Sequence, residues 1–160
     1  MAKSKEEKTN VMRTLEQKKI PYTAHSYDPE GPIDGVSVAQ TLGQPPEQVF
    51  KTLVTKGASG AYYVFDIPVA ENLDLKKAAR AVGEKSVAML PQKELLGLTG
   101  YVHGGCSPVG MKKQFPTVFH ATAPQYDTVC VSAGKIGAQV ECRPGDLIAL
   151  LRAKTADIIV

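Results

Sequence analysis

The stretch FKTLVTKGASGAYYVFDIPV, residues 50–69, decides the fold, because it holds two strand-like runs on either side of a break. Residues 50–55 and 61–69 are rich in aromatic and β-branched side chains, which fit the pleated surface of a sheet. Gly57 and Gly60 in the segment between them are typical of a turn. The sequence therefore predicts an antiparallel hairpin over this stretch.

Shorter helix-like and strand-like segments surround the hairpin. The predicted helices have either apolar residues at helical spacing or a capping residue at the start. Ser37 and Asp74 are the capping residues of two of them. The predicted helices cover residues 5–19, 38–42, 46–49, 75–82, 91–97 and 147–153. The further predicted strands cover residues 86–90, 117–121, 128–132 and 138–142. Because hairpin-like pairs alternate with helices, we expect a single compact α/β domain over residues 1–160. Its sheet should be mixed, mostly antiparallel and barrel-like, with helices around it.

Composition indicates an ordinary globular protein. With 160 residues, 43% hydrophobic and 22% charged, the chain can bury a core without disulfides. Its three cysteines, Cys106, Cys130 and Cys142, form no CxxC pair and are expected to be reduced thiols. The segment MAKSKEEKTN is charged, and no run approaches the roughly 18 apolar residues of a membrane span, so a cytoplasmic protein without a membrane partner is expected. A net charge of +3 permits contact with a polyanion without requiring it.

The glycine-rich stretch GYVHGGCSPVG, residues 100–110, is the first candidate site. His103 and Cys106 suggest a thiol–imidazole pair, but this spacing is weak support because no third orienting group is visible. Neither GxxxxGK[ST] nor GxGxxG is present. The glycines and Pro108 predict a sharply turned backbone that can approach a ligand and direct N–H groups at a carbonyl or phosphate oxygen. A purely structural turn is the alternative.

Four side chains outside this loop are further candidates. Lys51, followed by Thr52, interrupts an apolar strand-like run, so its ammonium either faces solvent or projects into a cleft. Ser132 precedes a small-residue turn, AGKIG, that suits a pocket wall or a hairpin. Tyr27, in HSYDPEG, is an aromatic platform or a partly exposed turn residue.

No metal site is expected from the sequence. His25, His103, His120 and Cys106 share no recognised ligand spacing. His25 and His120 stand in strand-like or turn contexts, where a hydrogen-bonded structural histidine is the simpler interpretation.

Five segments in this order carry a resemblance: HSYDP, QVFKTLV, LDLKKAARAVG, TGYVHGGCSPVGMKK and VSAGKIG, the last followed by a Glu and by GDL. Together they resemble the YbaK/EbsC family of bacterial Cys-tRNA(Pro) deacylases, which is related to the editing domain of prolyl-tRNA synthetases. The resemblance spans residues 8–158, nearly the whole chain. Its most specific parts are the Lys-Thr of FKTL and the glycine loop with GGxSPxG.

The resemblance implies a YbaK-like fold and hydrolysis of cysteine wrongly esterified to proline tRNA, without a cofactor or metal. Lys51 would be the principal functional side chain. The residues implied to bind the substrate are Tyr27, Thr52, Gly104, Gly105, Ser107, Pro108 and Ser132. The family is thought to let the substrate's own thiol attack its ester and leave as a cyclic thiolactone, and to work in a ternary complex with prolyl-tRNA synthetase and tRNA(Pro). A monomer is the default expectation.

Two departures from the family pattern leave alternatives open. Relatives often carry an acid two residues before the Glu matching Glu141, whereas this chain has Gln139, and Cys106 stands where a plain small or aliphatic residue is common. An Ala-tRNA(Pro) deacylase therefore remains an alternative, as does a binding module that holds tRNA or a small ligand without chemistry. The sequence also leaves open whether tRNA is recognised directly or through the synthetase.

Overall fold

Eight strands and five α-helices make up the fold over residues 8–160, the part of the chain that this computed structural model describes. The strands are β1 (Thr23–Ser26), β2 (Phe50–Gly57), β3 (Tyr62–Pro68), β4 (Val87–Met89), β5 (Thr117–His120), β6 (Val129–Ser132), β7 (Ala138–Cys142) and β8 (Lys154–Ala156). The helices are α1 (Asn10–Gln17), α2 (Gly35–Leu42), α3 (Leu75–Val82), α4 (Gln92–Thr99) and α5 (Pro144–Leu151), with 3₁₀ turns η1 (Pro46–Gln48) and η2 (Ala123–Gln125). The first three residues of the helix predicted over 5–19 lie outside the described residues.

The predicted hairpin is confirmed as the pair β2–β3. It is antiparallel, from Phe50 opposite Pro68 to Lys56 opposite Tyr62. These two strands are the centre of a five-stranded sheet with the order β4-β2-β3-β5-β8, in which β5 pairs in parallel with both β3 and β8. The mixed, mostly antiparallel character expected from the sequence is therefore confirmed.

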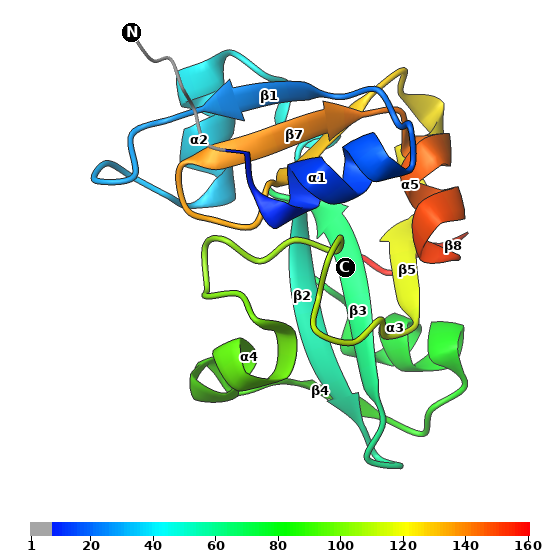
Figure 1. The fold of residues 1–160 in the computed structure, drawn as a ribbon. Coiled ribbons are helices and arrows are strands. Elements are labelled where there is room, and N and C mark those ends of the chain that lie inside the picture. The colour runs from blue at the N-terminus through cyan, green and yellow to red at the C-terminus, as the bar shows by residue number, and fades with distance from the viewer. Residues whose placement is uncertain (1–7) are drawn as a thin grey trace, which may run out of the picture.

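The remaining strands form a second, three-stranded antiparallel sheet with the order β1-β7-β6, drawn above the β2–β3 pair in Figure 1. The two sheets meet at an isolated parallel bridge between Val49 and Cys130. Pro68 is the last residue of β3, although the N–H of Val69 still donates to the carbonyl of Val49 at 2.8 Å. The α/β class is confirmed, but the strands of residues 8–160 form two sheets and no closed barrel.

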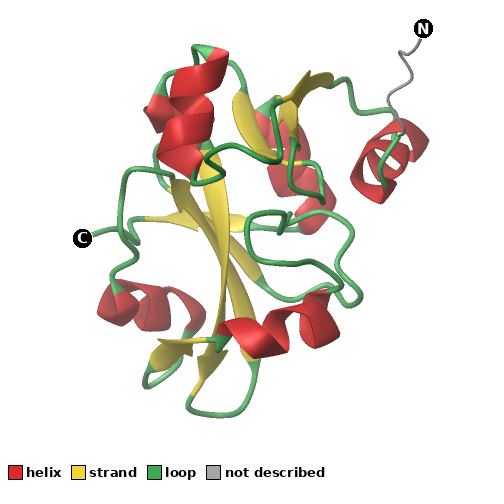
Figure 2. Ribbon diagram, turned by 90° about the vertical axis from the view of Figure 1, so that its left-hand side faces the viewer, coloured by secondary structure: helices red, strands yellow, loops and turns green. Residues whose placement is uncertain are grey.

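Both faces of β3 are buried. Val64 faces the main core, which also contains Leu15 of α1, Val140 of β7 and Leu147 of α5. Phe65 and Ile67 face a second core that α3 covers with Ala78 and Ala79. Figure 2 shows helices on either side of the long central strands. Burial on both faces explains why the sequence of this strand is apolar at nearly every position, with Asp66 as the exception.

The predicted start of α2 needs correction, and the sequence prediction missed two strands. The cap of α2 is Asp34, whose carboxylate accepts from the N–H of Ser37 at 3.1 Å, so this helix begins three residues before the predicted segment. Strands β1 and β8 were not predicted from the sequence. No helix among the described residues combines the length and apolar character needed to cross a bilayer.

Replacing Gly35 with alanine should destabilise the fold, because a Cβ at this position would lie 2.3 Å from Cγ1 of Val69. Valine is stiff, so we expect a loss of about 1–3 kcal/mol in the free energy of unfolding, measured by urea denaturation. Gly97→Ala is the matched control: it adds a Cβ within α4 that meets no atom within 4 Å apart from its chain neighbours and the backbone of its own helix, and it should stabilise by about 0.5–1 kcal/mol. Equal effects of the two substitutions would contradict this account of how the start of α2 packs on Val69, which follows β3.

Candidate functional site

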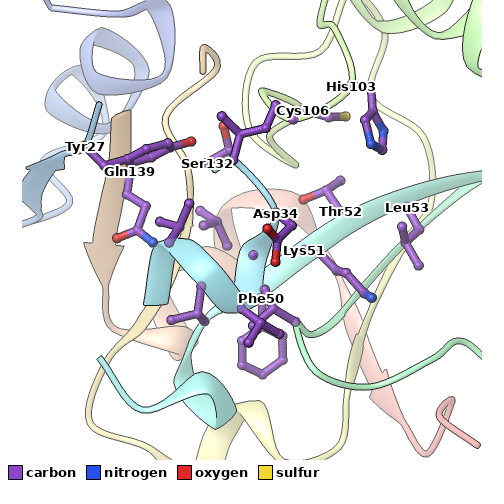
Figure 3. A pocket seen from close by; sticks show the side chains of 18 of the residues that line it. Tyr27, Asp34, Phe50, Lys51, Thr52, Leu53, His103, Cys106, Ser132 and Gln139 are labelled. Atoms are coloured by element: carbon purple, nitrogen blue, oxygen red, sulfur yellow. The ribbon is translucent and has the colours of Figure 1, made fainter. Parts of the chain in front are cut away.

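A pocket of about 370 Å³ opens where β2 begins, between the two sheets. It is lined by the start of β2, the N-terminal end of α2, the glycine loop and the ends of β6 and β7. The residues labelled in Figure 3 are Tyr27, Asp34, Phe50, Lys51, Thr52, Leu53, His103, Cys106, Ser132 and Gln139. Segments that are far apart in the sequence thus meet around one cavity.

Lys51 lines this pocket with a half-buried side chain. Burial lowers the pKa of its ammonium, and the carboxylate of Glu71 acts in the opposite direction. Within residues 8–160 no carboxylate lies within 4 Å of its Nζ atom. Its charge is therefore available to a negatively charged or polarised oxygen in the pocket.

Thr52 lies next to Lys51 in the pocket wall, and its hydroxyl is hydrogen-bonded to a residue behind that wall. Its Oγ1 donates to Oδ1 of Asp66 at 2.6 Å, across the β2–β3 ladder. Asp66 has no exposed surface, and burial raises the pKa of its carboxyl to about 7, although the hydrogen bond from Thr52 lowers it. A carboxyl group thus stands directly behind the wall of the pocket.

The glycine loop packs its backbone against the turn after β6. A Cβ at Gly105 would lie 2.9 Å from the backbone nitrogen of Ile136, so only glycine allows this approach. Gly104, with φ of +91°, lines the pocket. Ser107 and Pro108 are buried behind it, and the Ser107 hydroxyl accepts from the N–H of Val109 at 3.2 Å. At Gly104 the loop therefore presents backbone to the pocket.

Cys106 and His103 both line the pocket, but the thiol is poorly suited to act as a nucleophile. Burial and the neighbouring Asp66 raise the pKa of Cys106 to about 12, despite a hydrogen bond with Thr99. The thiolate is the reactive form of cysteine, and at this pKa the side chain is a protonated thiol at neutral pH.

Gln139 forms a reciprocal amide pair with Gln44, which follows α2. The Nε2 of Gln44 donates to Oε1 of Gln139 at 2.8 Å, and the Nε2 of Gln139 donates back to Oε1 of Gln44 at 3.1 Å. At Gln139 the side wall of the pocket is therefore formed by a neutral amide that is held by two hydrogen bonds.

Two other histidines make structural hydrogen bonds, as expected. Nδ1 of His120 accepts from the N–H of Ile158 at 3.3 Å. Nε2 of His25 lies 2.7 Å from Oε1 of Glu141, whose other oxygen accepts from Thr128. His25, Glu141 and Cys130 each offer one potential ligand atom, and these three atoms lie within 4.8 Å of one another. Both carboxylate oxygens of Glu141 already have hydrogen-bond partners, His25 and Thr128. Burial raises the pKa of Cys130 to about 12, which favours its protonated form.

The pocket brings together five of the eight predicted site residues. Lys51, Tyr27, Thr52, Gly104 and Ser132 line it, whereas Gly105, Ser107 and Pro108 form the body of the loop. The Ser132 hydroxyl accepts from the N–H of Gly134 at 3.1 Å, which fixes the turn beside the pocket.

Sequence reasoning missed two contributors to the site. Asp34 lines the pocket from the N-terminus of α2, and the Asp-Gly that opens this helix was the signal that could have indicated it. Asp66 stands behind the wall, and an acid in the middle of the apolar run YVFDIPV was its signal.

Sequence comparisons agree on one family. A family model described as an aminoacyl-tRNA editing domain matches residues 34–150. A protein of Enterococcus faecalis, EbsC, is 47% identical over 160 residues, which cover 99% of this chain and 98% of that protein. EbsC is provisionally described as a Cys-tRNA(Pro)/Cys-tRNA(Cys) deacylase.

Solved structures show the same fold. The crystal structure of a protein provisionally described as a trans-editing enzyme for prolyl-tRNA synthetase superposes with a TM-score of 0.80 at 28% identity and covers 94% of each chain. The hypothetical protein APE2540 superposes with a TM-score of 0.86 at 22% identity, over 94% of this chain and 99% of that one. The second likeness concerns the fold alone.

The buried Asp66 should make stability fall as pH rises. The ordinary pKa of this carboxyl is 3.8, against about 7 in the folded chain, so between these values the folded state holds a proton that the unfolded state has lost. Relative to Asp66→Asn, which does not titrate, the free energy of unfolding should decrease from about pH 4 to about pH 7.5 by up to about 4 kcal/mol. Urea denaturation across this range measures the difference. Parallel pH profiles of the two proteins would show that Asp66 is already ionised in the folded state.

Proposed function

The chain belongs to the family of aminoacyl-tRNA editing domains, and from this we propose that it is a trans-acting deacylase that removes cysteine from mischarged Cys-tRNA(Pro). The observation that carries the proposal is the half-buried ammonium of Lys51 at a pocket walled by the backbone of the glycine loop. Such a site offers a positive charge to a polarised ester oxygen. The same activity in the cell would place the protein in the cytoplasm.

The reaction we propose uses the thiol of the substrate. The thiol loses its proton, its sulfur bonds to the ester carbonyl carbon, and the bond from that carbon to the ribose oxygen breaks. The ribose oxygen takes up a proton, and water then opens the cyclic thiolactone. An internal thiol held in line can reach an effective concentration of about 10⁵ M, so the protein needs only to bend the substrate and stabilise the oxyanion. The high pKa of Cys106 supports this route because it argues against an enzyme thiolate.

Lys51→Ala should lower kcat/KM for Cys-tRNA(Pro) by about 100-fold or more, because it removes a charge that stabilises the developing oxyanion. Lys56→Ala is the matched control: Lys56 lies on the same strand, but its Nζ is 5.8 Å from the centre of the Tyr62 ring, away from the pocket. This variant should retain full activity. The assay is release of radiolabelled cysteine from Cys-tRNA(Pro), with Ala-tRNA(Pro) measured in parallel.

The parallel assays separate the alternatives. Faster release of alanine than of cysteine would assign the protein to the other mischarged ester, and binding of tRNA without release of either would indicate a binding module. Cys106→Ala distinguishes the two chemical routes, since it should keep most of the activity if the substrate supplies the thiol. A loss as large as that of Lys51→Ala would instead indicate a covalent enzyme intermediate.

We also propose that tRNA identity is supplied by prolyl-tRNA synthetase in a ternary complex. A net charge of +3 is small for a protein that must hold tRNA alone, because affinity for nucleic acid rises with the number of phosphate contacts. The immobilised protein should retain prolyl-tRNA synthetase when tRNA(Pro) is present and release it after ribonuclease treatment. Tight binding that is specific for tRNA(Pro) in the absence of the synthetase would contradict this partner.

A further inference from the structure

Asp66 is a buried acid for which the fold offers no structural requirement. It lies on β3 with no exposed surface, and its register partners are Thr52 of β2 and Phe119 of β5. Oδ1 accepts from Thr52, while Oδ2 has no hydrogen-bond partner among residues 8–160. No lysine, arginine or histidine within those residues forms an ion pair with it.

A residue of this kind is costly in a strand core. Burying a polar atom without a partner destabilises a protein, and a β-branched apolar side chain would fit the same position of the strand. Groups that violate packing rules in this way concentrate at functional sites. Both residues that Asp66 acts on, Thr52 and Cys106, line the pocket, so the carboxyl affects the pocket without touching its contents.

The hydrogen bond to Asp66 determines what Thr52 presents to the pocket. A threonine hydroxyl has one proton and two lone pairs. Because the proton is donated to Oδ1 of Asp66, only lone pairs remain for the pocket side, and Thr52 is an acceptor there. Figure 3 shows the hydroxyl of Thr52 in the cavity wall, while the ammonium of Lys51 extends in another direction.

We propose that Asp66 is a positioning residue for substrate selection: by holding the proton of Thr52, it makes Oγ1 of Thr52 an acceptor for a donor on the side chain of the bound aminoacyl group. A thiol can donate to this oxygen, whereas the methyl group of alanine leaves it buried without a partner. Sites built around a polar contact discriminate in this way against analogues that lack the group. The inference rests on the proposed function and deepens it, because it names a binding contact that adds to the discrimination against alanine, whose ester also lacks the attacking thiol.

The test is the ratio of kcat/KM for Cys-tRNA(Pro) to that for Ala-tRNA(Pro). Asp66→Val removes the acceptor and should lower this ratio by about fivefold to tenfold, the size of one hydrogen bond. Asp66→Asn keeps an acceptor oxygen for Thr52 and should restore the ratio to within about twofold of the native value. Thr52→Val should lower the ratio as much as Asp66→Val, and the double variant should lower it no further, because Asp66 acts through Thr52.

Thr55→Val is the matched control. Thr55 is also a buried threonine of β2 whose hydroxyl donates across the ladder, to the carbonyl of Tyr63 at 3.3 Å, and it does not line the pocket. Its replacement should leave the ratio unchanged. Urea denaturation accompanies each assay: Asp66→Val should be at least as stable as the native chain at neutral pH, which a merely structural role for Asp66 would not allow.

Three outcomes would overturn the inference: an unchanged ratio in both Asp66→Val and Thr52→Val, additive losses in the double variant, or the same loss in Thr55→Val. If Asp66→Val does not fold, the inference is still tested by the ratio of kcat/KM for the two charged tRNAs in Thr52→Val and Asp66→Asn. The proposed function is tested separately, by the native chain. If that chain releases neither amino acid, the proposed function fails and the inference fails with it, whereas release of cysteine with an unchanged ratio in the variants refutes the inference alone.

Discussion

Seven residue pairs join β2 to β3, from Phe50 opposite Pro68 to Lys56 opposite Tyr62, and the other layers pack against this ladder. Side chains alternate along a strand, so a slip of one residue would exchange the two faces of the hairpin. The observed register places Val64 in the core between the sheets and Phe65 against α3. It also sets Thr52 beside Asp66 at the start of β2, where the second sheet approaches. Core packing and site geometry are thus set by the same pairing.

The polar groups around the pocket differ in how fully they are satisfied. Gln139 and Gln44 pair with each other through two hydrogen bonds. Asp66 does not follow this pattern, since one of its oxygens is left alone in the part of the chain that the structure describes. Most buried polar atoms in proteins are paired, so an exception directly behind a pocket wall calls for a functional explanation rather than a structural one.

The sequence predicted those parts of the molecule where local physics decides. Residues 50–69 are strand-like on both sides of a glycine turn, and the cap at Asp74 is a local hydrogen-bonding feature, so the hairpin and α3 were correctly predicted. Strands β1 and β8 are short, with mostly exposed residues, and exist because a partner strand is present. For the same reason the separation into two sheets was not visible, since it depends on how distant segments meet.

The candidate site shows the same division. The Lys-Thr pair and the glycine loop stand out as short motifs, and both reach the pocket. The contribution of Asp66 depends on a partner fourteen residues away, across the hairpin, and on the burial of both. Within the sequence its signal is an acid in an apolar run, which indicates an unusual residue but does not reveal its partner Thr52.

The reciprocal amide pair of Gln44 and Gln139 has a consequence for how this protein can change over evolutionary time. An acid at position 139 would still accept from Nε2 of Gln44 but would face its Oε1 with a second acceptor, so either residue changed alone leaves a mismatched partner. The two positions, 95 residues apart, are therefore coupled, and a change at one favours a change at the other. Lineages that carry an acid at the second position should carry a compensating donor at the first, so that substitutions at the two sites are correlated among descendants.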